Sequence, residues 1–248
     1  FYGARGEISA QNSGRVGNSG FIVTRNSVVV VDTGGSYGHA RDIIAAIRRV
    51  TPKRIRIAII TTPFQEFLFG ASAFRDIGAI VLSHTETAKL IRQRCEECLA
   101  RSRHHAGENA FVGTRIIIPD EQIEHSTRLS IDGRVIDLYH FGWGATPGDL
   151  VVFDRSGGTA FTGALLSVKR IPDTHDWNFS EGWRHSLDRL RELGAQTLVP
   201  GYGSGADGAS IDAVQNYLRE LSADVRREFD AGASLTEAVE RVQIPAVA

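Results

Sequence analysis

The segment TTPFQEFLFGASAF, residues Thr61–Phe74, joins an apolar stretch to a short run with helical character. The stretch Arg56–Thr61 before it predicts a buried strand. Phe64 and Phe67 lie in the connection, and Glu66 is its one carboxylate. A transition-metal site needs imidazole, thiolate or carboxylate donors, and phenylalanine has no lone pair to offer. The connection therefore supplies one good metal donor.

This segment resembles the metal-binding loop of the metallo-β-lactamase superfamily, which reads T-H-x-H-x-D-H-x-x-G. Thr61 and Gly70 match the first and last positions of that motif. The four positions that hold metal ligands in the family are occupied here by Thr62, Phe64, Glu66 and Phe67. The resemblance therefore implies the usual fold of the family with an altered metal loop.

Three further segments resemble family motifs in the same order along the chain. GWGATPGDLVVF (142–153) has Ala145 where the family has a histidine, and FTGALL (161–166) has Ala164 where it has a bridging aspartate. LVPGYG (198–203) has Tyr202 where the family has its last histidine. The resemblance thus implies that all seven ligand positions are replaced. We predict no metal, no cofactor and no catalytic residue in the usual sense.

The resemblance extends over nearly the whole chain, including NSGFIVTRNSVVVVDTGGS at 18–36. Within the superfamily, the chain is most similar to the periplasmic branch near SoxH and the quinoprotein relay system metallohydrolases. Four stretches carry this likeness: GRVGNSGFIV; the Cys95 and Cys98 pair followed by GTRIIIPD; VKRIPD; and LREL with GASLTEAVERV. It implies a periplasmic or secreted protein. Because the chain begins at Phe1 and contains no Met, we expect a processed or trimmed product.

Composition and pattern indicate one α/β domain spanning residues 1–248. The chain is 42% hydrophobic and 23% charged, with a net charge of −1, so no global basic field would attract nucleic acid. No apolar run reaches the length of a membrane span. Strands in two groups, each followed by helices, predict a four-layer αββα sandwich. We also expect a strand at Arg115–Ile118 and a mobile loop at His104–Asn109.

Cys95 and Cys98 lie three residues apart within a helix predicted over Glu86–Ser102. A local disulfide, a free thiol pair, a redox pair and a share in a zinc site are the alternatives. A thioredoxin-like pair needs a helix N-terminus to lower the thiol pKa, and this pair lies in the middle of its helix. We predict at most a structural disulfide, without a role in activity.

The predicted cleft is formed mainly of apolar residues. Its expected lining is Thr62, Phe64, Glu66, Phe67, Ala145, Ala164 and Tyr202. Such a lining suits a small apolar ligand or a protein surface, and a partly open cleft is favoured over a collapsed one. Asp32 and Asp149 are expected to order turns. Glu66 and Tyr202 remain an alternative acid/base pair.

Two classes of function follow from this lining. The first is a non-catalytic binding protein or partner subunit, paired with an active paralogue or a periplasmic dehydrogenase, or binding a small apolar ligand. The second is a hydrolase with a rebuilt active site.

Overall fold

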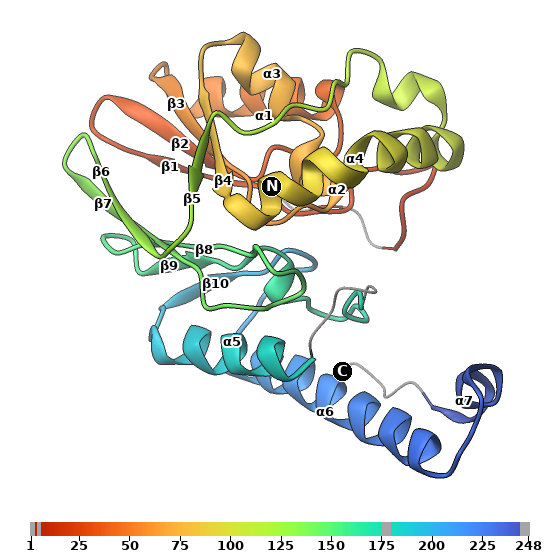
Figure 1. Ribbon diagram of the computed structural model, residues 1–248. Coiled ribbons are helices and arrows are strands. Elements are labelled where there is room, and N and C mark those ends of the chain that lie inside the picture. Colours follow the sequence, from red (N-terminus) through yellow and green to blue (C-terminus); the bar gives the residue numbers. More distant parts are fainter. Residues whose placement is uncertain (1–2, 4–5, 175–179, 244–248) are drawn as a thin grey trace.

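Two β-sheets packed face to face, each covered on its outer side by helices, form the protein (Figure 1). The computed structural model describes residues 3, 6–174 and 180–243. The predicted αββα sandwich is therefore confirmed. The prediction of a single domain over residues 1–248 stays a prediction. It includes residues 1–2, 4–5, 175–179 and 244–248, which lie outside the described residues.

The first sheet comes from the N-terminal half and has the order β1-β2-β3-β4-β5. Its strands are β1 (Gly20–Val23), β2 (Ser27–Val31), β3 (Arg54–Ile59), β4 (Ile80–His84) and β5 (Glu121–Ile123). β1 and β2 are antiparallel, and the remaining pairs are parallel. All five residues of β2 are buried, as expected for a strand with covered faces on both sides.

The second sheet has the order β10-β9-β8-β7-β6. Its strands are β6 (Thr127–Ile131), β7 (Arg134–Tyr139), β8 (Val151–Asp154), β9 (Thr159–Phe161) and β10 (Thr197–Val199). Only the β9–β10 pair is parallel. Asp132 and Gly133 join β6 to β7 with φ of 51° and 82°, which is the backbone of the predicted tight hairpin.

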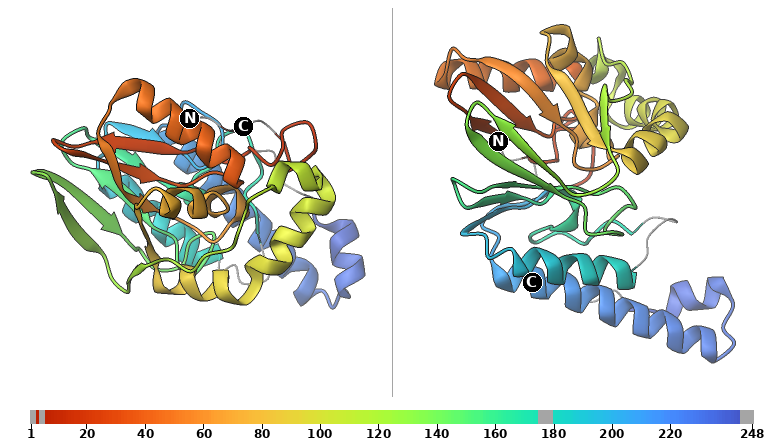
Figure 2. Two further views of the ribbon diagram at one scale, coloured as in Figure 1. Left: turned by 90° about the horizontal axis from the view of Figure 1, so that it is seen from above. Right: turned by 60° about the vertical axis from the view of Figure 1, so that its left-hand side comes forward.

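Helices cover the outer faces of both sheets. Those of the N-terminal half are α1 (Tyr37–Val50), α2 (Gln65–Leu68), α3 (Ala71–Asp76), α4 (Thr85–Ala106) and the 3₁₀ turn η1 (Glu108–Phe111). Those of the C-terminal half are the 3₁₀ turn η2 (Gly163–Leu165), α5 (Ser180–Glu192), α6 (Gly208–Asp230) and α7 (Leu235–Arg241). Figure 2 shows α6 extending beyond the sandwich, with α7 at its far end. Within the described part of the chain, every helix is too short or too polar to cross a bilayer.

The inner core lies between the sheets and is aliphatic. Val29 and Val31 of β2 and Ile59 of β3 pack against Ile136 and Leu138 of β7, and all five are almost fully buried. Burying a side chain of this size is worth roughly 1.5–3 kcal/mol. Alternate residues of the same strands face outward, where Val28 and Val30 meet the helices of the first half.

Two local expectations are wrong. Arg115–Ile118 lies outside the sheet, because contact with β4 begins only at Asp120. The Asp120 amide donates to the Val81 carbonyl at 2.8 Å, and its side-chain carboxylate accepts from the Val81 amide at 2.8 Å. The predicted mobile loop at His104–Asn109 is instead the last turn of α4 and the start of η1. Ala106 and Phe111 are buried on either side of it and hold it in place.

The turn after β2 locks the first sheet to the loop that follows β3. Asp32 is buried with φ of 62°, and its carboxylate accepts a hydrogen bond from the Thr61 amide at 2.9 Å. The Thr33 amide donates to the Phe67 carbonyl at 2.7 Å. A Cβ on Gly70 would lie 2.0 Å from the Thr33 carbonyl oxygen, so only glycine fits there. The predicted structural role of Asp32 is therefore consistent with its contacts.

Asp32→Asn is expected to flatten the pH dependence of stability. Burial raises the pKa of Asp32 from 3.8 to about 8, against the hydrogen bonds from Thr61. The folded protein therefore holds a proton that the unfolded chain releases, so this stabilisation is complete below about pH 4 and is lost as the pH rises toward about 8. Asparagine keeps an acceptor for Thr61 and tolerates positive φ. Urea unfolding at a series of pH values measures the slope.

The control is Asp42→Asn, because Asp42 is an exposed aspartate on α1. A smaller slope remains in Asp32→Asn, since burial also raises the pKa of Asp149 to about 6. A slope in Asp32→Asn equal to that of the unmodified protein would contradict the assignment.

Candidate functional site

The seven residues predicted to line the cleft come together at one edge of the sandwich. Phe64, Phe67, Ala145, Ala164 and Tyr202 belong to one cluster of buried side chains. Glu66 is connected to this cluster by its hydrogen bond with Tyr202. Thr62 lies beside Asp149, which is four residues after Ala145 in the sequence. Four separate segments thus converge, as the family-like motifs predict.

Asn18 fixes the segment that carries Tyr202. Its amide group donates hydrogen bonds to the carbonyl oxygens of Pro200 at 2.8 Å and Gly203 at 2.7 Å. Its backbone amide donates to the Gly201 carbonyl at 2.8 Å. Three bonds from one buried asparagine leave the loop little freedom. Tyr202 is therefore held at a defined position above the Thr61–Phe74 segment.

A buried hydrogen bond between Tyr202 and Glu66 lies at the centre of the cluster. The Tyr202 hydroxyl donates to Oε1 of Glu66 at 2.6 Å, and both side chains are almost fully buried. Burial raises the pKa of the Glu66 carboxyl, and the bond from Tyr202 offsets part of this rise. The Phe67 ring meets the Tyr202 ring edge-on with centroids 5.3 Å apart. These three side chains, hereafter the plug, fill the space between the two halves of the protein.

Thr62, Ala145 and Ala164 complete the closed region. All three are buried, and the two alanines add no polar atom. The nearest carboxylate, Asp149, accepts hydrogen bonds from the Thr146 amide at 2.9 Å and the Thr146 hydroxyl at 2.7 Å. Asp149 therefore orders its own turn, as predicted.

The donors at this edge do not fit a zinc pair. The seven positions offer one carboxylate, one phenol and one threonine hydroxyl, and the carboxylate is already bonded to the phenol. Zinc binds imidazole, thiolate and carboxylate groups, usually four donors to an ion. Among residues 3, 6–174 and 180–243, no three His, Cys, Asp or Glu side chains are grouped as a metal site would require. No metal-dependent step can be built on these residues.

The expectation of a partly open cleft needs correction at its centre. Thr62, Phe67, Ala145, Ala164 and Tyr202 are each at most 4% exposed, so the region of the family's metal ligands is filled. The opening lies beside it, in a cavity of about 360 Å³ between α4 and the Val168–Asp173 segment. Phe64, 8% exposed, and Glu66 are the two predicted residues that line this cavity.

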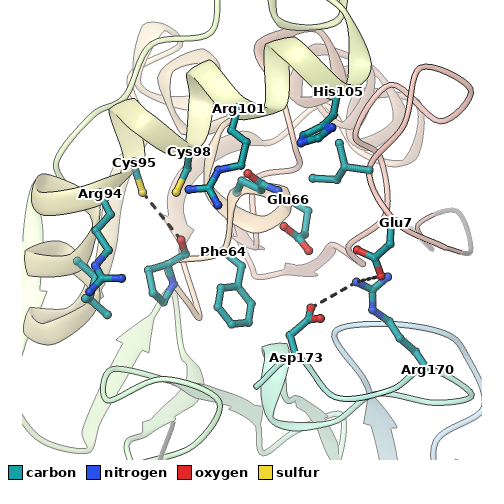
Figure 3. Close-up of a pocket in the computed structure, with 14 residues that line it drawn as sticks. Glu7, Phe64, Glu66, Arg94, Cys95, Cys98, Arg101, His105, Arg170 and Asp173 are labelled. Atoms are coloured by element: carbon teal, nitrogen blue, oxygen red, sulfur yellow. Dashed lines mark hydrogen bonds and ion pairs between the residues drawn. The ribbon is translucent and has the colours of Figure 1, made fainter. Parts of the chain in front are cut away.

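One wall of the cavity is the face of α4 that carries Arg94, Cys98, Arg101 and His105 (Figure 3). These positions recur at intervals of three and four, so they share one side of the helix. The opposite wall carries Arg170, which pairs with Glu7 at 3.1 Å and with Asp173 at 3.3 Å. The sequence singled out Cys98 as part of a cysteine pair but did not place it or the arginines at a cavity. The helical spacing shows which residues share one side of α4, but it does not show which part of the protein that side faces.

The match to known proteins agrees with this architecture. The model of the metallo-β-lactamase superfamily matches residues 12–202. The chain therefore belongs to the metallo-β-lactamase superfamily.

Solved structures of low sequence identity share the fold. A metallo-β-lactamase from Pontibacter korlensis superimposes with a TM-score of 0.67 at 20% identity, covering 80% of this chain and 85% of that one. The metallo-β-lactamase IND-7 gives a TM-score of 0.66 at 17% identity, covering 82% and 86%.

A curated relative is the linear primary-alkylsulfatase of Pseudomonas sp. (strain ATCC 19151). It is 21% identical over an alignment of 267 positions that covers 90% of this chain. The chain spans about half the length of that relative, 49%.

Phe67→Ala and Phe64→Ala are expected to differ in their effect on stability. Phe67 is fully buried against Tyr202, so its removal leaves a closed cavity and lowers the free energy of unfolding by about 3–5 kcal/mol. Phe64 borders a cavity that already exists, and its removal should cost about half as much. Urea denaturation measures both. Equal losses in the two variants would contradict the distinction between plug and cavity wall.

Proposed function

We propose that this protein is a metal-independent binding member of its superfamily, and that the cavity beside the plug binds a small anion with an apolar body. The observation that carries this proposal is the pairing of a cationic helix face with an aromatic wall in one cavity. Arg101 and His105 project from α4 on one side, and Phe64 lies on the other (Figure 3).

The charges around the cavity favour an anion at the α4 wall. Arg170 pairs with two carboxylates, Glu7 and Asp173, so the wall that carries it has no net positive charge. The contact of Arg101 with Glu97 is long, 3.9 Å, and both side chains are exposed, so this pair is weak. Burial raises the pKa of Glu66 and so weakens its negative charge. Arg101 therefore presents to the cavity a guanidinium charge that its own ion pair offsets only weakly.

The remaining lining supplies the apolar surface. Ile8, Pro63, Phe64 and Leu90 surround the space below the helix face. Ligand cavities of this size are commonly apolar with a few polar groups that fix orientation. The name of the curated relative describes a linear primary alkyl sulfate. That molecule combines the same two features, an anionic head and an apolar chain.

The proposal includes the replacement of the family's metal ligands at the seven positions. It also includes the SoxH-like branch and a periplasmic or secreted location, which follow from the motif resemblance. A protein partner, such as an active paralogue or a periplasmic dehydrogenase, stays a prediction. In this account the plug takes over the structural part of the metal's role, because it joins the same segments of the two halves.

Octyl sulfate is expected to bind one site per chain, and Arg101→Gln is expected to weaken binding about tenfold. Losing a hydrogen bond to a charged group costs about 1.5–3 kcal/mol, and 1.4 kcal/mol is tenfold in affinity. Calorimetric titration before and after exhaustive treatment with a chelator measures this. Arg219→Gln is the control, because Arg219 is exposed on α6, outside the cavity lining. Equal affinity of Arg101→Gln and the unmodified protein, or loss of binding after chelation, would refute the proposal.

A second candidate is a hydrolase with a rebuilt site. Its specific support is the family itself, whose curated relative is named as a sulfatase, together with the 2.6 Å Tyr202–Glu66 pair as acid and base. Release of inorganic sulfate from octyl sulfate, lost in Glu66→Gln, would establish this candidate instead. Glu66 does line the cavity, but both side chains are at most 5% exposed and are bonded to each other, which limits their contact with a substrate.

A further inference from the structure

Two thiols line the cavity, and their surroundings differ. Cys95 is buried, Cys98 is half-buried, and neither forms a disulfide. Both project from α4 toward the space above Phe64 (Figure 3). Of the alternatives that the sequence left open, the structure has the free thiol pair. The expectation that the pair has no role in activity is reconsidered here.

Cys95 is placed as a hydrogen-bond donor. Its sulfur lies 3.9 Å from the carbonyl oxygen of Pro63, a weak contact, and its other neighbour is the sulfur of Cys98. The bond to Cys98 and burial together raise the pKa of Cys95 far above its ordinary value. Cys95 therefore remains a thiol, and its one proton can turn from the weak contact with the Pro63 carbonyl to Cys98 when Cys98 is ionised.

The pKa of Cys98 is lowered, in contrast to that of Cys95. The hydrogen bond from Cys95 lowers the pKa of Cys98 from 9.0 to about 7, with smaller contributions from Arg101 and Arg94 and opposition from burial and Glu97. The thiolate is the nucleophilic form of cysteine. A thiol whose pKa lies near the ambient pH is also the most effective one in disulfide exchange. Cys98 is also the more exposed of the two thiols and lines the cavity on the same helix face as Arg101. Access and position therefore single out Cys98 rather than the buried Cys95.

We propose that Cys98 is a nucleophile for small disulfides that carry negative charge, with Arg101 attracting the charge and Phe64 contacting the organic group. The Cys98 thiolate attacks one sulfur of the disulfide R–S–S–R, and a bond forms between these two sulfurs. The original S–S bond breaks, and the second sulfur leaves as the thiolate RS⁻ with the electron pair. The products are a mixed disulfide on Cys98 and one free thiolate.

This activity uses the cavity of the proposed function but does not depend on binding of octyl sulfate. Once the mixed disulfide forms, Cys98 carries no charge, and burial still raises the pKa of Cys95. Cys95 is 2% exposed and stays reduced, because a buried thiol that keeps its proton is a poor nucleophile for a second exchange. The product is therefore a lasting mixed disulfide, in contrast to a thioredoxin-like cycle that ends in a disulfide between the two cysteines.

The test follows the coloured thiolate released from dithiobis(nitrobenzoate), a dianionic disulfide, under native conditions at neutral pH. We expect one thiol per chain to react in a fast phase. Cys98→Ser and Cys98→Ala should both abolish it. Cys95→Ala removes the donor and should slow the fast phase about fourfold, because the fall in thiolate fraction is partly offset by the greater nucleophilicity of a thiolate of higher pKa. Cys95→Ser keeps a donor and should leave the rate close to that of the unmodified protein.

Arg101→Gln separates charge recognition from a structural effect. It should slow the reaction with dithiobis(nitrobenzoate) several-fold and leave the rate with dithiodipyridine, an uncharged aromatic disulfide, unchanged. Arg219→Gln should change neither rate. Urea unfolding of every variant establishes that it is folded before the kinetics are compared.

Three results would overturn the proposal. They are a fast phase that persists in both Cys98 variants, a Cys95→Ala rate equal to that of the unmodified protein, and an Arg101→Gln variant slowed equally with both disulfides. Because the readout is the release of a thiolate, it succeeds or fails independently of the titration with octyl sulfate.

Discussion

The hydrogen bond between Tyr202 and Glu66 is the constraint on which the rest of the site depends. It joins residues 136 positions apart in sequence, at 2.6 Å, and both side chains are at most 5% exposed. A buried carboxyl without a partner is costly, and so is a buried phenol, so each side chain needs the other. Phe67 packs against the pair and excludes water from it. The plug therefore closes the edge at which the two halves of the fold meet.

Because the plug closes that edge, the reactive side chains that a ligand can reach lie beside the plug. The space that remains open lies under α4, where cationic side chains and two thiols face Phe64. Charges in a partly enclosed cavity act more strongly than on an open surface, because water screens them less. An anion that enters the cavity meets Arg101 and the thiolate-forming Cys98 at the same wall. Binding of an anionic amphiphile and reaction with an anionic disulfide are thus two consequences of one arrangement.

Most of the fold and the location of the plug were predictable from sequence. Apolar periodicity gave the strands and helices, the ordered motifs gave the αββα sandwich, and they also gave the convergence of Thr62, Glu66 and Tyr202. The errors at Arg115–Ile118 and His104–Asn109 arose because long-range contacts of Asp120 and Phe111 override local pattern. The cavity was missed for a related reason. Its cationic wall is formed by one face of α4, and only tertiary packing shows what that face meets.

The central claim is that the plug occupies the place of a metal site and cannot hold a transition metal. Equilibrium dialysis against zinc, followed by elemental analysis of the unmodified protein and Glu66→Ala, tests it most directly. The account predicts the same zinc content in both proteins, well below one equivalent, since one carboxylate bonded to a phenol is too poor a donor set. One or two equivalents of zinc in the unmodified protein, lost in Glu66→Ala, would contradict it.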